Sequence, residues 1–146
     1  MTLYEILQNK GSAVFTIDPA ATLAEAAEEL VRRNVGCLVV CSRNLAAGEQ
    51  LAGVLTERDI LRFCAASGSD LTGTTVAAVM TSRVVTGSLQ DSVEATMGLM
   101  TTRRIRHLPV LAEGRLVGLV SIGDVVKWQH DHLAMENQFM KNYLTG

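Results

Sequence analysis

Two short motifs of the same type place a hydroxyl and a carboxylate side chain where we expect a helix to start. They are Gly53-Val-Leu-Thr56-Glu-Arg-Asp59 and Gly118-Leu-Val-Ser121-Ile-Gly-Asp124. Two interpretations are open. A threonine or serine N-cap with an acid three residues on is how many helices satisfy their first amides. A carboxylate at a helix start can also accept both hydroxyls of a ribose, while cationic side chains and amides take a phosphate. Aspartate in both copies favours ligand binding.

The sequence contains no motif that is typical of catalysis. It has no GxGxxG, no GxxxxGK phosphate loop, no HExxH and no GxSxG. His130 and His132 fall on different faces of an expected helix, and we interpret Cys37 and Cys41 as core thiols and not as metal ligands. We therefore expect a binding protein and not an enzyme, with no catalytic residues, no metal and no catalytic cofactor.

Composition bounds the class of protein. The chain has 146 residues, 48% hydrophobic and 19% charged, with a net charge of −2, which excludes a disordered chain. The charge is too small to attract nucleic acid or acidic lipid, and no apolar segment reaches membrane-spanning length. Three cysteines without a CxxC fit free thiols in a reducing compartment, and the start lacks features of a signal peptide. We expect a cytoplasmic protein that binds neither nucleic acid nor membrane.

The chain is an internal duplication. Residues 35–40 align with residues 105–110 at an offset of 70, and residues 51–60 align with residues 116–125 at an offset of 65. The first copy therefore carries a five-residue insertion, which we place in residues 44–50. We divide the chain into residues 1–70 and 71–146, each with its own lead-in segment.

Each copy has the same order of predicted elements. A short extended piece precedes an amphipathic helix, which contains Leu23 and Leu30 in the first copy and Val93 and Met100 in the second. Two apolar runs and a last helix follow. The short connection at residues 112–115 predicts that the two runs are adjacent antiparallel strands. The predicted unit is β-α-β-β-α, repeated.

On these residues the whole chain, from residue 3 to 146, resembles a tandem pair of CBS domains, known as a Bateman module. The resemblance is clearest at the two motifs that end in Asp59 and Asp124. Phrases such as Arg106-His-Leu-Pro-Val110 are similar to those of small stand-alone CBS-pair proteins. The resemblance implies an α+β fold of tandem β-α-β-β-α repeats with pseudo-twofold symmetry and a long C-terminal helix.

The resemblance implies two clefts between the repeats that bind AMP, ADP, ATP or NAD(H), and less readily S-adenosylmethionine. Asp59 and Asp124 would hold ribose, with Thr56 and Ser121 near the sugar or phosphate. Each cleft would be completed from the other repeat. The Asp124 cleft would add Ala13, Val14, Val35 and Cys37, and the Asp59 cleft would add Arg83, Val84, Ile105 and His107.

The two clefts are not equivalent in this sequence. Residues 103–107 hold three arginines and a histidine, whereas the matching residues 33–37 hold one arginine. A helix C-terminus by itself favours the first two arginines, but Arg106 and His107 lie beyond the helix. We therefore predict that the Asp124 cleft is the better phosphate site, with Arg106 as its main cation. Arg58 takes the place of Gly123 in the other copy, so the Asp59 cleft either uses this arginine or is narrower.

A long helix is predicted over residues 125–144, with apolar residues that either pack on their own module or pair two copies of the chain. We favour a homodimer. The leading hypothesis is a regulatory adenosine-nucleotide sensor, responding to energy or redox state, that acts in trans on an unidentified target protein. The alternative is a constitutive interaction or scaffold protein that binds no nucleotide.

Overall fold

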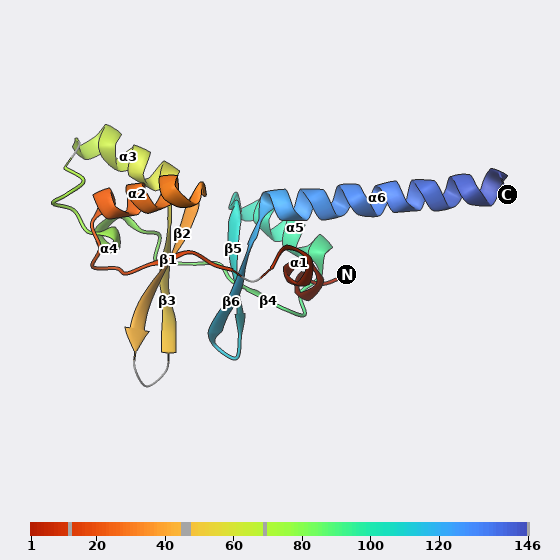
Figure 1. The fold of residues 1–146 in the computed structure, drawn as a ribbon, viewed down its shortest axis with the longest axis horizontal. Helices are drawn as coiled ribbons and strands as arrows, with labels where there is room; N and C mark the ends of the chain where they lie inside the picture. The colour runs from red at the N-terminus through yellow and green to blue at the C-terminus, as the bar shows by residue number, and fades with distance from the viewer. Residues whose placement is uncertain (12, 45–47, 69, 146) are drawn as a thin grey trace.

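The structure, a computed structural model, describes residues 1–146 except residues 12, 45–47, 69 and 146, and for residues 43, 44, 48 and 49 it describes the backbone only. The chain forms two three-stranded sheets that stand side by side, with helices gathered at one end of each (Figure 1). Strands β3 and β6 bring the two sheets into contact.

The first repeat has the predicted order of elements. Strand β1 pairs in parallel with β2, and β2 pairs antiparallel with β3, which gives the sheet order β1-β2-β3. Its elements are β1 (Thr16–Ile17), α2 (Leu23–Arg33), β2 (Cys37–Asn44), β3 (Gly48–Thr56) and α3 (Glu57–Ser67).

The second repeat follows the same plan, so the predicted α+β fold of tandem β-α-β-β-α units is confirmed. A short helix, α4 (Val76–Val79), leads into it. Its elements are β4 (Gly87–Ser88), α5 (Val93–Arg103), β5 (His107–Ala112), β6 (Arg115–Ser121) and α6 (Ile122–Thr145).

Local backbone details repeat with the sequence. Both α2 and α5 end in a left-handed residue, Asn34 at φ 54° and Arg104 at φ 55°. The hairpin β5–β6 turns through Glu113 and Gly114, both with positive φ, the backbone that matches the twist of two paired strands. The corresponding loop of the first repeat contains residues 45–47 and so lies partly outside the described residues. Strands β2 and β3 of the first repeat have 8 and 9 residues, whereas β5 and β6 of the second repeat have 6 and 7. Longer strands are expected in the first repeat, because that copy carries the insertion.

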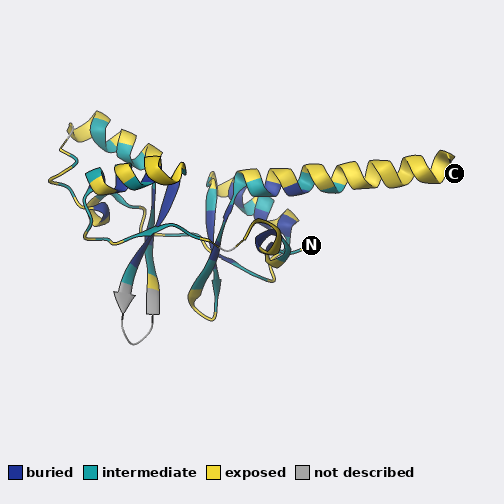
Figure 2. Ribbon diagram, in the orientation of Figure 1, coloured by how far each residue is buried: buried dark blue, intermediate teal, exposed yellow. Residues whose placement is uncertain are grey.

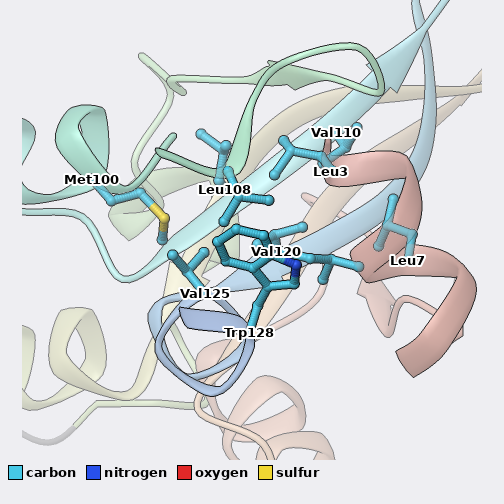
Figure 3. Close-up of a cluster of buried hydrophobic side chains, with 10 residues drawn as sticks. Leu3, Leu7, Met100, Leu108, Val110, Val120, Val125 and Trp128 are labelled. Carbon is cyan, nitrogen blue, oxygen red and sulfur yellow. The ribbon is translucent and has the colours of Figure 1, made fainter. Parts of the chain in front are cut away.

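Each repeat has its own hydrophobic core, but the lead-in helices are exchanged between the repeats. Helix α1 (Leu3–Lys10) precedes the first repeat, yet its Leu3, Ile6 and Leu7 are buried in the core of the second. Figure 3 shows Leu3 and Leu7 beside the second repeat's own core residues. Conversely, Val76 of α4 is fully buried in the core of the first repeat.

Backbone hydrogen bonds hold both exchanged helices. The Leu3 N–H donates to the Asp91 carbonyl at 3.0 Å, and the Val76 N–H donates to the Ala21 carbonyl at 2.8 Å. The division at residues 70 and 71 stays a prediction, but side-chain packing crosses it in both directions.

The second half of α6 extends beyond the body of the second repeat (Figure 1). In the first turns of α6, Val125 and Trp128 are buried in the core of the second repeat, whereas the turns beyond residue 133 are exposed (Figure 2). Packing of the whole tail on its own module, one of the two alternatives above, is therefore wrong. Although α6 has 24 residues, no helix in the described part of the chain is long and apolar enough to span a membrane.

Candidate functional site

The Thr56/Asp59 motif lies at the junction of β3 and α3 and forms a complete capping box. The Asp59 N–H donates to Thr56 Oγ1 at 3.2 Å, and the Thr56 N–H donates to Asp59 Oδ2 at 2.9 Å. The structural interpretation of this motif is thus confirmed. Because the cap uses Oδ2, it leaves Asp59 Oδ1 available to a ligand.

The Ser121/Asp124 motif has the same geometry at the junction of β6 and α6. The Asp124 N–H donates to Ser121 Oγ at 3.1 Å, and the Ser121 N–H donates to Asp124 Oδ2 at 2.8 Å. Each of these carboxylates is therefore held in place by its own helix start. Both motifs present a fixed, half-buried carboxylate.

One contact distinguishes Asp124 from Asp59. Lys10, the last residue of α1, donates from Nζ to Asp124 Oδ2 at 2.7 Å and to the Leu119 carbonyl at 2.8 Å. Burial raises the pKa of Asp124, but the hydrogen bonds from Lys10 and Ser121 outweigh it and hold the pKa below its usual value. Asp124 is therefore ionised at neutral pH. Among the described residues, no lysine or arginine is paired with Asp59 in this way.

His107 lies directly beside the second motif. It is the partner of Ser121 across the β5–β6 ladder. Burial and the nearby cations Lys10 and Arg106 lower the pKa of His107, while the carboxylates of Asp124 and Glu57 partly oppose them. Glu57 belongs to the first repeat, so charges of both repeats act on His107.

The first motif has a thiol in the matching place. Cys37 is the partner of Thr56 across the β2–β3 ladder. Burial, with a smaller contribution from the charge of Asp59, raises the pKa of Cys37 to about 12. This thiol is neutral and unreactive at neutral pH.

His107 and Cys37 thus lie beside the motif of their own repeat. The sequence prediction instead gave His107 to the Asp59 cleft and Cys37 to the Asp124 cleft, and these cross-repeat assignments stay predictions. Val35 and Ile105 pack against the core of their own repeat.

The remaining predicted residues are distributed around the two motifs. Arg106 is exposed, and its carbonyl accepts the Ile122 N–H at 2.8 Å, which ties it to the first turn of α6. Of the others, Val14 and Val84 are partly buried. The exposed ones are Ala13, Arg58, Arg83 and Gly123.

The glycine of each motif has a packing role. A Cβ on Gly118 would lie 2.7 Å from Leu7 of α1, and one on Gly53 would lie 2.6 Å from the Thr81 carbonyl. Because neither glycine has a side chain, each leaves room for the lead-in segment that comes from the other repeat. Sequence reasoning missed this role and missed Lys10. The signal was present in the matched lead-ins, but spacing alone does not tell which repeat a lead-in packs on.

A separate hollow of about 610 Å³ lies beside α1, and none of the predicted site residues line it. Its lining residues are Tyr4, Leu7, Gln8, Gly11, Leu89, Leu116 and Val117. Within the described residues, no cluster of three or more His, Cys, Asp or Glu could hold a metal ion.

Comparison with known proteins decides the family. The protein-family model described as "CBS domain" matches residues 11–66 and again residues 76–131. The chain belongs to the CBS-domain family. The two matches coincide with the two repeats of the fold, so the protein is a tandem CBS pair.

Relatives of this CBS pair include proteins of similar architecture. The chain is 36% identical to the mitochondrial CBS domain-containing protein CBSX3 of Arabidopsis thaliana, over 99% of this chain and 72% of the relative. The solved structure of ATU1752 from Agrobacterium tumefaciens is 34% identical and matches with a TM-score of 0.80, covering 88% and 99% of the two chains. PAE2072 from Pyrobaculum aerophilum, solved in complex with AMP, is 30% identical with a TM-score of 0.73, covering 85% and 89%.

Proposed function

We propose that this CBS pair is a regulatory module that binds adenosine nucleotides at its two strand-to-helix junctions. One observation carries the proposal: each junction fixes an aspartate through Oδ2 and leaves Oδ1 for a ligand hydroxyl. The complex of a 30% identical relative with AMP supports the choice of ligand class. AMP, ADP, ATP and NAD(H) are the preferred candidates, with S-adenosylmethionine less favoured.

The Asp124 junction is the better candidate for the phosphate-binding site. Lys10 is paired with Asp124, and His107, which follows Arg106, is the strand partner of Ser121, whereas Cys37 holds the matching place beside Thr56. This arrangement supports the preference for the Asp124 side that the sequence suggested. A bound nucleotide would regulate a partner protein in trans to the extent that it binds one conformation of the module more tightly than another.

Ligand-dependent stabilisation tests the proposal. At a free ligand concentration about 100-fold above its dissociation constant, a true ligand stabilises the fold by about 2.7 kcal/mol. We expect this from at least one of AMP, ADP, ATP and NADH, measured by thermal or urea unfolding. The single tryptophan, Trp128, lies one turn after Asp124 and is buried, so its fluorescence gives a local signal for the Asp124 side.

Asparagine variants provide the matched control. Asp124→Asn and Asp59→Asn each keep an oxygen for the cap but lose the negative charge that holds ribose hydroxyls. We expect Asp124→Asn to weaken nucleotide binding more than Asp59→Asn does. If no adenosine compound stabilises the wild-type protein, the sensor hypothesis is wrong and a constitutive scaffold role is supported. Unchanged binding in both variants would disprove the site assignment.

We also propose that the chain acts as a homodimer through the projecting part of α6. Phe139 and Tyr143 are 71% and 77% exposed and continue, at helical spacing, the face on which Val125 and Trp128 are buried. An exposed apolar face of this kind on a soluble domain typically marks an interaction surface.

A further inference from the structure

Lys10 connects the end of α1 to the proposed nucleotide site. Its ammonium group bonds both to the Leu119 carbonyl in β6 and to Asp124 Oδ2 in the first turn of α6. The side chains of Lys10 and Asp124 are 34% and 22% exposed, so the pair lies at the surface of the site and can be reached by a ligand.

Both partners of this pair retain a free bonding position. An ammonium group has three N–H donors, and Lys10 uses two of them in the described contacts. The hydrogen bonds that Asp124 accepts from described residues fall on Oδ2. A ligand can therefore bind without breaking the pair, if it offers a hydroxyl to Asp124 Oδ1 and a negatively charged acceptor to Lys10.

Lys10 neutralises negative charge beside the proposed phosphate position. Its ammonium group is paired with the Asp124 carboxylate, and both of these charges act on the neighbouring His107. Removal of the Lys10 charge would leave the Asp124 carboxylate without its paired cation. A phosphate would then meet repulsion, whereas an uncharged ligand would not.

We propose that Lys10 makes the Asp124 site selective for adenosine ligands that carry a phosphate, over uncharged adenosine and over S-adenosylmethionine, which is cationic overall. This inference rests on the proposed function. Lys10 acts here as a specificity-determining residue that comes from the lead-in helix packed on the second repeat.

The Asp59 site is expected to lack this selectivity. The equivalent lead-in helix, α4, ends at Val79, and Arg83 beyond it is exposed and makes no ion pair with Asp59 in the described part of the chain. The two sites of the pair would therefore differ in the charge of the ligand that they prefer.

Calorimetric titration with AMP and with adenosine tests the inference. It is carried out in an Asp59→Asn background, so that the Asp124 site dominates the signal. We expect Lys10→Met to weaken AMP binding by roughly tenfold, as for a partly exposed charged hydrogen bond, and to leave adenosine binding within about twofold. Lys10→Arg should restore the preference for AMP, since it restores the charge.

Lys141→Met is the matched control, because Lys141 is exposed near the far end of α6. Its AMP and adenosine affinities should equal those of the parent protein. An unchanged ratio of AMP to adenosine affinity in Lys10→Met would overturn the inference, as would an equal loss for both ligands, which indicates a structural role for the lysine. A parent protein that binds neither ligand would also overturn the inference, and the proposed function itself fails only if the wild-type protein binds none of AMP, ADP, ATP and NADH.

Discussion

The carboxylates of Asp59 and Asp124 end the same local motif but lie in different electrostatic surroundings. Each caps its own helix through Oδ2, and this is a local property of four consecutive residues. What differs is brought from elsewhere in the chain: Lys10 from the lead-in helix to Asp124, and from the neighbouring strand a partly buried histidine beside Ser121 or a buried thiol beside Thr56. At the scale of residues, the two sites are therefore alike in shape and different in charge.

The lowered pKa of His107 makes a prediction about stability. Folding holds the pKa of His107 below its usual value of 6.5. The unfolded chain therefore binds more protons at this histidine than the folded protein does as the pH falls. His107 therefore gives full stability above about pH 6.5 and loses it as the pH falls through the folded-state value. Asp124 does not contribute to this change, since its pKa lies below 3.8.

We expect the urea midpoint of the wild-type protein to fall between about pH 7.5 and about pH 5.5. In His107→Gln this fall should be smaller, because the titrating ring is absent. His130→Gln is the control, as the His130 side chain is 80% exposed, and it should behave as the wild type does. An identical pH dependence in His107→Gln and the wild type would show that His107 does not titrate differently on folding.

Helix α6 performs two tasks along its length. Its first turn carries Asp124, and its next turns fill the second core with Val125 and Trp128. Beyond residue 133 the helix is exposed (Figure 2), and its exposed side chains include Phe139, Met140 and Tyr143. At the scale of elements, α6 connects the proposed ligand site to the proposed dimer interface.

Glutamates on this face should separate the dimer. We expect the double variant Phe139→Glu/Tyr143→Glu to be monomeric by light scattering, because two charges cannot be buried unpaired in an apolar interface. The wild type should have twice the 15.7 kDa mass of one chain. Far-UV circular dichroism checks that α6 remains helical.

Ala134→Glu is the control for the dimer prediction. Ala134 is exposed and lies about 140° around the helix from Phe139, so this variant should remain dimeric. A monomeric wild type would contradict the homodimer, and a dimeric double variant would place the interface elsewhere.

The two repeats depend on each other because each supplies a helix to the other's core. Repeats of this size bury a smaller fraction of their surface than larger domains do, so each is only marginally stable on its own. The exchange of α1 and α4 enlarges both cores. The contact between β3 and β6 completes the pair, and we expect it to unfold as one unit.

A substitution near the chain terminus tests this dependence. Leu3 is fully buried in the second core, so Leu3→Ala should lower the free energy of unfolding by about 3 kcal/mol in urea denaturation. Val31→Ala is the control, because Val31 is 81% exposed and its truncation should change stability by less than about 0.5 kcal/mol. An unchanged midpoint in Leu3→Ala would show that α1 does not contribute to the core.

The sequence by itself determined the duplication, the order of elements and the two capped aspartates. These features depend on residues close together in the chain: apolar periodicity, the hydroxyl and acid of each cap, and the turn at Glu113 and Gly114. The repeat also made the family recognisable.

Only the tertiary structure decided which groups meet at the two junctions. The packing of α1 on the second repeat places Lys10 on Asp124, 114 residues away in the chain, and strand pairing places His107 beside Ser121. Sequence spacing could not decide the Lys10–Asp124 contact, because a lead-in helix has the same pattern whichever repeat it packs on. The packing of α1 on the second repeat depends on a contact between residues far apart in the chain, in which Gly118 leaves room for Leu7.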